Sequence, residues 1–200
     1  MRDAVVSSAA TREAILDATD RLLARYGFKK MTIDDLAREV GIGKGSVYLH
    51  FPSKEEIALS HIDRLIERLK ERLRSISRGN GSVEEKLRQM LVERVTYRFD
   101  SIQHYTQSLD ELLSNLRTSL LERRRRYFAD EAKILAEIVT EGQQAGVFLE
   151  GEAFDLGLTL VSATNSLLPY SLSAYELGDR EVVAGRAAKT ADLLIRGLMR

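Results

Sequence analysis

Residues 32–54 constrain the fold of this chain more than any other stretch. They begin with a short amphipathic run whose apolar residues recur at helical spacing, and Gly41 ends that run. A tight connection at 41–43 leads to a second short run at 44–50, and Pro52 then breaks the chain. Two short helices joined by a glycine turn predict a helix-turn-helix, which presents its second helix to the major groove of DNA.

A set of apolar, glycine and polar residues extends this pattern through residues 11–57. Its members are Ile15, Leu16, Ala18, Gly27, Thr32, Leu36, Ala37, Gly41, Tyr48, His50, Phe51, Ser53, Lys54 and Glu55. In this combination the segment resembles the N-terminal domain of the TetR/AcrR (tetracycline-repressor-like) family of bacterial transcriptional regulators. The resemblance covers about one quarter of the chain, and the remainder is similar to the family only in length and helical character.

The resemblance implies a set of DNA contacts around the second helix of the motif. In the family, the positions that commonly touch backbone phosphates match Thr32, Lys44, Tyr48, His50 and Lys54. The positions that face the groove match Gly45, Ser46 and Val47. The chain departs from the family at Gly43, where a serine is common, so we expect a weaker cap on this helix.

Core packing is the alternative role for the larger side chains of this helix. We favour core packing for Val47 and Phe51. We favour DNA contact for Lys44, Tyr48 and Lys54, because donors at these offsets reach phosphates and base edges when a helix enters the groove.

Composition confines any DNA-binding surface to a small area. The 200 residues include 30 Lys and Arg and 30 Asp and Glu, so the formal net charge is zero. DNA recognition must therefore depend on a local group of residues rather than on a broad positive surface. The absence of cysteine excludes disulfides, thiol redox sensing and thiolate metal sites.

One uncharged stretch, residues 156–175, is long enough to span a bilayer. It also contains many serines and threonines together with Asn165 and Pro169, which are costly in lipid. We interpret it as a helix buried within a soluble protein. The N-terminus lacks the apolar segment of a secretory signal, so we expect a cytoplasmic protein with no membrane partner.

Apolar periodicity predicts an all-α protein with about nine helices. Capping-box patterns begin at Thr32, Ser53 and Ser82. The predicted helices cover about 11–26, 32–40, 44–50, 54–77, 83–99, 109–121, 127–144, 154–172 and 179–199. We expect a helix-turn-helix domain at 1–53 and an effector-binding and dimerisation domain at 54–200, linked by the helix at 54–77.

The glycine-rich segment 41–46 could also be a phosphate-binding loop. It lacks the Gly-x4-Gly-Lys-Ser/Thr spacing, follows a predicted helix, and has Ser46 where Gly-x-Gly-x-x-Gly requires glycine. None of the three histidines follows a glutamate by three residues, as a Glu-x-x-His metal site in a helical bundle requires. We therefore expect no catalytic residues, no metal and no cofactor.

Residues 83–172 form the candidate effector domain, because aromatic and polar residues stand on otherwise apolar helices there. A small-molecule pocket needs apolar walls and a few placed polar groups. The candidate lining residues are Tyr97, Phe99, His104, Tyr105, Tyr127, Phe128, Asn165 and Tyr170. The alternative for each is ordinary core or surface. The basic run 123–126 points around its helix and has acidic neighbours, so we interpret it as a solvated surface.

The last two predicted helices carry more apolar surface than a monomer needs. We expect them to form an isologous four-helix dimer interface, as these helices do in the resembled family. Its residues would be Leu160, Val161, Thr164, Leu167, Leu168, Ala187, Ala191, Leu194, Ile195 and Leu198. The alternative is an intrachain core alone.

Together these features predict a homodimeric DNA-binding regulator, most often a repressor in the resembled family. It would bind double-stranded DNA at a near-palindromic operator and be released by a small, largely apolar effector. The second hypothesis is a ligand-independent DNA-binding adaptor controlled by a protein partner. An enzyme ranks last, because no nucleophile and base stand at a readable spacing.

Overall fold

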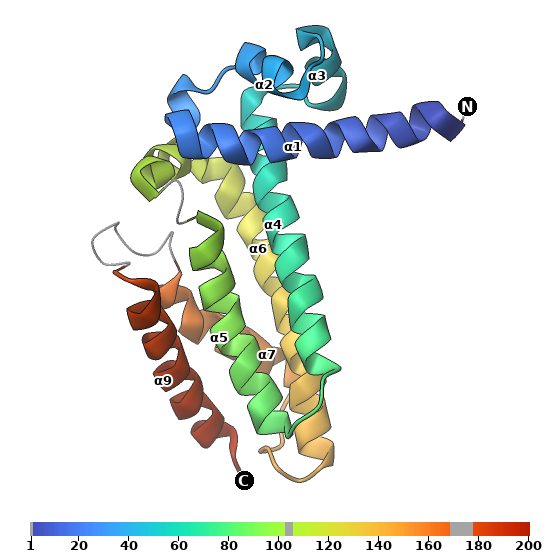
Figure 1. Cartoon of the computed structure of the whole chain (residues 1–200). Helices are drawn as coiled ribbons and strands as arrows, with labels where there is room; N and C mark the ends of the chain where they lie inside the picture. Colours follow the sequence, from blue (N-terminus) through green and yellow to red (C-terminus); the bar gives the residue numbers. More distant parts are fainter. Residues whose placement is uncertain (1, 103–105, 169–177) are drawn as a thin grey trace. The chain divides into compact units, whose positions relative to one another are not determined.

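The computed structural model describes the backbone of residues 2–102, 106–168 and 178–200, and the side chains of residues 8–102, 114–168 and 178–200. Within these ranges the chain forms eight α-helices and one 3-10 helix, which confirms the predicted all-α fold (Figure 1). The elements are α1 Arg2–Lys30, α2 Ile33–Val40, α3 Lys44–His50, α4 Lys54–Ser77, α5 Val83–Ile102, α6 Thr106–Gln144, α7 Ala153–Thr164, the 3-10 helix η2 Asn165–Leu167 and α9 Arg180–Leu198.

Two helices are longer than the periodicity predicts. α1 begins at Arg2 and is interrupted at Gly27, whose φ of 74° and ψ of 170° are not helical, before it continues to Lys30. The predicted helices 109–121 and 127–144 are one helix, α6. The intervening residues are mostly arginine and glutamate, which are good helix formers, so the gap in the apolar pattern does not break the helix.

One predicted helix, 154–172, is shorter than expected. Here α7 ends at Thr164 and the chain tightens into η2. The Thr164 hydroxyl donates to the carbonyl oxygens of Leu160 and Val161, the kind of side-chain bond to the backbone that competes with a regular helix. None of the helices in the described ranges has the length and apolarity needed to cross a membrane.

The chain divides into two compact units. The first comprises residues 1–64 and 104–120, and contains α1 to α3. The second comprises residues 65–103 and 121–200, and contains α5, α7 and α9. Both α4 and α6 contribute residues to each unit, so the first unit extends beyond the boundary at residue 53 that we expect from the sequence.

The helix-turn-helix lies in the first unit, where α2 contacts both α1 and α3 (Figure 1). The predicted capping box of α2 is confirmed, because the Thr32 hydroxyl accepts from the Asp35 amide while the Asp35 carboxylate accepts from the Thr32 amide. Gly41 ends α2 in the left-handed conformation, with φ 76° and ψ 32°. The buried side chains of α1 to α3 and their flanks include Ile15, Leu16, Leu23, Met31, Leu36, Val47 and Phe51.

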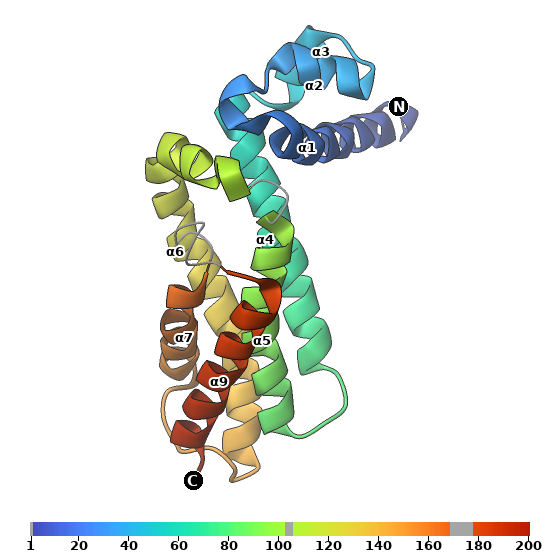
Figure 2. The same ribbon diagram turned by 60° about the vertical axis from the view of Figure 1, so that its left-hand side comes forward.

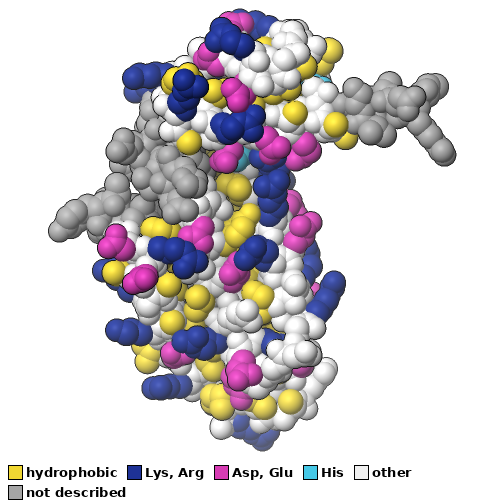
Figure 3. All heavy atoms as spheres, in the orientation of Figure 1, with side chains coloured by type: hydrophobic (Ala, Val, Ile, Leu, Met, Phe, Trp, Pro, Cys, Tyr) yellow, Lys and Arg dark blue, Asp and Glu magenta, His cyan; other side chains and the backbone are white. Residues whose placement is uncertain are grey.

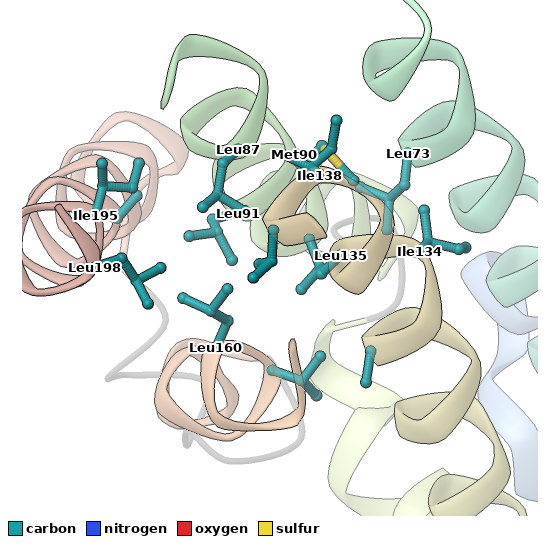
Figure 4. Close-up of a cluster of buried hydrophobic side chains, with 14 of the residues drawn as sticks. Leu73, Leu87, Met90, Leu91, Ile134, Leu135, Ile138, Leu160, Ile195 and Leu198 are labelled. Carbon is teal, nitrogen blue, oxygen red and sulfur yellow. The ribbon is translucent and has the colours of Figure 1, made fainter. Parts of the chain in front are cut away.

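A second apolar core fills the other unit (Figure 4). α5 packs along α9, and α7 contacts both of these helices (Figure 2). The labelled core side chains come from α4, α5, α6, α7 and α9, and they are Leu73, Leu87, Met90, Leu91, Ile134, Leu135, Ile138, Leu160, Ile195 and Leu198. Each helix of this unit thus contributes one apolar face to the same core.

α6 and α7 approach each other closely at Gly157. A Cβ added to this glycine would lie 2.5 Å from the backbone carbonyl oxygen of Ala132. A backbone atom cannot move aside as a flexible side chain can, so the helix crossing requires glycine here. Gly185 on α9 is the opposite case, because an added Cβ would meet nothing within 4 Å.

We expect Gly157→Ala to lower the melting temperature. The overpacking costs about 1–3 kcal/mol, which exceeds the gain of at most about 1 kcal/mol from removing a helical glycine. Gly185→Ala is the matched control and should stabilise the chain by about 0.5–1 kcal/mol. Thermal unfolding followed by circular dichroism measures both, and equal shifts in the two variants would contradict the close approach.

Candidate nucleic-acid interface

The turn between α2 and α3 is built from glycine. The Ile42 amide donates to the Ala37 carbonyl at 2.9 Å, which completes the C-terminal cap of α2. Gly43 is the N-cap of α3 with φ −73° and ψ 149°, and it makes no side-chain cap. A Cβ added at Gly43 or Gly45 would meet nothing within 4 Å. The backbone at the start of α3 is therefore open to close approach by another molecule.

α3 has one face in the core and one in solvent. Val47 and the following Phe51 are buried, as the sequence predicts. Tyr48 is 47% exposed, so it lies on the surface rather than in the core. Lys44 and Gly45 are exposed, while Ser46 and His50 are half-buried. The exposed face thus combines small residues with donors, as a major-groove reader requires.

Lys44 is paired with an acidic residue in the free protein. Its Nζ donates to Oδ2 of Asp34 at 3.0 Å, across the turn. This hydrogen bond and the charge of Asp34 raise the pKa of Lys44, so the ammonium is fully charged. Both side chains are about half exposed, and an exposed ion pair of this kind contributes little stability. A phosphate could therefore replace Asp34 at small cost.

Thr32 has a structural task in addition to its predicted DNA contact. Its hydroxyl donates to Oδ2 of Asp35 at 2.6 Å and accepts from the Asp35 amide at 3.1 Å. The hydrogen bond from Thr32 is the main cause that lowers the pKa of the Asp35 carboxyl. A hydroxyl oxygen has two lone pairs and only one proton, so Thr32 could still accept a bond but has no proton for a phosphate in this arrangement.

Lys54 ties the start of α4 to the end of α1. Its Nζ donates to the carbonyl oxygens of Phe28 at 3.0 Å and Lys29 at 3.4 Å. The same nitrogen lies 4.4 Å from the centroid of the Phe28 ring. An ammonium has three N–H donors, so Lys54 retains one for a phosphate while it holds the two helices together.

The sequence comparisons place the helix-turn-helix in a known family. The model of the family described as bacterial regulatory proteins, tetR family, matches residues 15–60, which include α2 and α3. This match supports assignment of the chain to the TetR/AcrR family. Its members regulate transcription, and the fold of this chain agrees with that assignment.

Relatives extend the similarity over nearly the whole chain. A fatty acid metabolism regulator protein from Bacillus subtilis is 24% identical over 188 residues, which cover 92% of this chain and 93% of the relative. A TetR-family transcriptional regulator from Pectobacterium atrosepticum matches with a TM-score of 0.78 and 18% identity, over 97% of this chain and 96% of that one.

A third match is to a protein solved with a bound molecule. The transcriptional regulator FadR from Bacillus subtilis, in complex with stearoyl-CoA, gives a TM-score of 0.69 and 18% identity over 93% of this chain and 98% of that chain. At this level of identity, the two solved structures support the TetR fold alone.

The residues predicted to line an effector site are dispersed. Phe99 and Tyr127 are each 7% exposed, while Phe128 and Asn165 are half-buried. Tyr97 borders a shallow surface hollow of about 380 Å³, which is lined by Arg68, Glu71, Arg72, Ser75 and Tyr97. This hollow is too charged for an apolar ligand. Three further candidates, His104, Tyr105 and Tyr170, lie outside the described residues.

A buried polar cluster in the second unit joins two of these candidates. Nη2 of Arg94 donates to Oδ1 of Asn165 at 2.6 Å, and its guanidinium carbon lies 5.5 Å from the Phe128 ring centroid. The same guanidinium donates to Oε2 of Glu131 at 2.6 Å and to the Thr164 hydroxyl at 2.7 Å. Arg94 and Glu131 are fully buried, and we did not predict either residue to be part of a site.

The spacing of two arginines in the sequence indicates this cluster. Leu87, Leu91, Arg94 and Arg98 follow one another at helical spacing on α5, so two arginines continue an apolar stripe. Arg98 also donates to Glu131, through Nη2. Charged residues on a core-facing stripe must be paired, because burying an unpaired charge is expensive. Within the described part of the chain, no group of His, Cys, Asp and Glu could hold a metal ion.

Opposing effects act on the Glu131 carboxyl. Burial would raise its pKa, but the charges of Arg98 and Arg94 and their hydrogen bonds outweigh burial and lower the pKa below the ordinary value of 4.5. Glu131 is therefore an ionised carboxylate at the centre of the cluster. A carboxyl whose pKa is lowered by folding stabilises the fold above pH ~4.5, and that stabilisation is lost as the pH falls through the folded-state pKa.

We expect Glu131→Gln to destabilise the chain by about 3–5 kcal/mol at neutral pH, because both arginines lose their buried counter-charge. The difference from the unchanged chain should shrink as the pH falls below about 4.5, where the carboxylate itself becomes protonated. Urea unfolding at a series of pH values measures this. Glu137→Gln, an exposed change on the same helix, is the control, and a pH-independent difference for Glu131→Gln would contradict the proposed ionisation.

Most of the residues predicted for the dimer interface are buried within the single chain. Eight of the ten are buried within the single chain, namely Leu160, Val161, Thr164, Leu168, Ala187, Ala191, Ile195 and Leu198. Five of them, Leu160, Val161, Ala191, Ile195 and Leu198, belong to the apolar core of the second unit. Only Leu167 and Leu194 are half-buried. An apolar helix stripe has the same sequence pattern whether it faces its own chain or another, so periodicity alone could not separate the two roles.

Proposed function

We propose that this TetR/AcrR regulator is a homodimeric repressor that binds a near-palindromic operator through α3 and is released by a small, largely apolar ligand. The observation that carries the DNA-binding role is the outer face of α3. There Gly43 and Gly45 leave the backbone open, and Lys44 and Tyr48 stand exposed beside them. Small residues admit the helix to the major groove, and the flanking donors fix it on the phosphates.

Each predicted contact residue has a distinct role in this proposal. Lys44 exchanges Asp34 for a phosphate, and the exposed hydroxyl of Tyr48 contacts another. Lys54 uses its remaining donor, and His50 stands at the end of α3. Gly45 and Ser46 come closest to the base edges, while Thr32 acts mainly through the α2 cap. Because the chain has no net charge, affinity depends on these few contacts, doubled by the dimer.

We expect Tyr48→Ala to weaken operator binding while the melting temperature stays nearly unchanged, because the side chain is 47% exposed. Lys44→Ala should reduce the slope of log affinity against log salt by about one per protomer, which corresponds to one lost phosphate contact. Asp34→Asn is the control with the opposite effect, because it removes the negative partner of Lys44 and leaves the ammonium available for a phosphate. Fluorescence anisotropy with labelled DNA at several salt concentrations measures all three.

A collapse of the melting temperature in Tyr48→Ala would mean that Tyr48 supports the fold rather than the DNA. An unchanged salt slope in Lys44→Ala would remove Lys44 from the interface.

Dimerisation through α7 and α9 remains part of the proposal, with a different set of side chains. Three apolar residues of these helices are exposed in the single chain, namely Leu158 at 38%, Val182 at 46% and Leu193 at 68%. Apolar groups on the outer faces of two helices suit an isologous contact, in which each patch meets its own copy. The two helix-turn-helix motifs of such a dimer would bind half-sites that lie about one helical turn of DNA, or a multiple of it, apart.

The proposed ligand has an apolar chain. The second unit offers apolar and aromatic walls, including Phe99, Tyr127 and Phe128. The regulator FadR with stearoyl-CoA and the fatty acid metabolism regulator support a fatty acyl compound as the first ligand to test. Because α4 contributes residues to both units, a ligand that favours one position of this helix could change DNA binding. The effect is limited by its difference in affinity for the two states.

We expect saturating stearoyl-CoA to weaken operator binding by about 5–150-fold, the usual range of coupling between two sites. Operator titrations at fixed salt, with and without the ligand, measure this. Coenzyme A without the acyl chain is the control for the head group, and acyl chains of decreasing length test the apolar wall. If no acyl compound changes operator affinity while the DNA is still bound, the ligand-independent adaptor becomes the better hypothesis.

A further inference from the structure

Leu49 on α3 is the most exposed large apolar side chain among the described residues. It is 87% exposed, whereas the next, Leu193, is 68% exposed. Two residues earlier, Val47 is completely buried. Successive residues of an α-helix are turned by about 100°, so Leu49 points almost directly away from the core that holds Val47. It therefore stands at the centre of the outer face of α3.

The neighbours of Leu49 leave its side chain free. Gly45 precedes it by four residues, one turn earlier on the same face, and has no side chain to cover it. Tyr48, the residue before it, and Lys44, at the start of the helix, are exposed and carry hydrogen-bond donors. Leucine itself neither donates nor accepts a hydrogen bond, so it can recognise only an apolar group.

A single exposed leucine on a protein surface is ordinary and calls for no explanation. Leu49 differs because it lies on the face that the proposed function places in the major groove. The apolar group that the major groove displays is the C5-methyl of thymine, and apolar side chains contact it in sequence-specific complexes.

We propose that Leu49 reads a thymine in each operator half-site by packing against its C5-methyl group. The proposal rests on the proposed function and names one base of each half-site that α3 recognises. Gly45 lets the helix backbone come close to the base edges, and Leu49 then covers the methyl group and excludes water from it. Lys44 and Tyr48 hold the helix on the phosphates, which carry no sequence information.

The test compares thymine with deoxyuridine, which differs only by that methyl group. The probe is the tightest-binding duplex selected by the unchanged protein from a pool of randomised duplexes. Each thymine of this duplex is replaced in turn by deoxyuridine, and affinity is measured by fluorescence anisotropy at fixed salt. We expect one position per half-site to lose about fourfold in affinity, and about 15-fold when both half-sites are changed, from the burial of one methyl-sized group at each.

Leu49→Ala should bind the thymine and deoxyuridine duplexes equally at that position. Lys44→Ala is the matched control on the same helix. It should bind more weakly and with a flatter salt dependence, yet keep the fourfold preference for thymine. The melting temperature of Leu49→Ala should stay within about 2 °C of the unchanged chain, because the side chain is almost fully exposed.

Failure of this inference can be told apart from failure of the proposed function. If the pool yields no selectively bound duplex, the DNA-binding proposal itself is overturned. If a duplex is selected but no deoxyuridine substitution weakens binding, or Leu49→Ala keeps the same preference, Leu49 does not read thymine. If Leu49→Ala loses affinity by the same factor for both duplexes, so that the preference for thymine is retained, Leu49 contacts the sugar–phosphate backbone instead.

Discussion

The outer face of α3 depends on two side chains that never meet solvent. α3 is only seven residues long, and a helix of that length does not form alone in water. Burial of Val47 and Phe51 in the core of the first unit holds α3 in place. Burial of such side chains contributes about 1.5–3 kcal/mol each to stability. With one face fixed in this way, the helix can carry an outer face chosen entirely for contact with another molecule.

Positive and negative side chains balance each other in this protein. Basic and acidic side chains are interspersed over the face drawn in Figure 3, and the formal charges of the whole chain cancel. Two lysines of the first unit follow the same pattern, since Lys44 pairs with Asp34 and Lys54 binds two backbone carbonyls. Each lysine has an intramolecular partner in the absence of DNA, and it must exchange or share that partner when the protein binds DNA. Such a surface attracts nonspecific DNA weakly, so discrimination depends more on shape and on base contacts.

Much of the first unit could be predicted from sequence because its signals are local. The capping box at Thr32, the left-handed Gly41 and the glycine N-cap of α3 each involve residues within one helical turn. The second unit depends on long-range choices. The eight buried residues among those predicted for the dimer interface look the same in sequence whether they face their own chain or a partner. Only the assembled core distinguishes them, by the side chains that it leaves exposed, such as Leu158 and Leu193.

The Arg94–Glu131 cluster shows why a site of this kind escapes a residue-by-residue reading. Its members come from α5, α6, the end of α7 and the start of η2, and Arg94 is separated in sequence from Glu131 by 37 residues, from Thr164 by 70 and from Asn165 by 71. Replacing such a cluster by apolar residues is often neutral or stabilising in other proteins, so its presence is weak evidence for stability. Its geometry is more informative. Arg94 of α5 joins Asn165, the residue at which α7 gives way to the 3-10 turn, to Glu131 of α6. A displacement of α6 would therefore be transmitted to the end of α7 through charged hydrogen bonds that hold only within narrow distances.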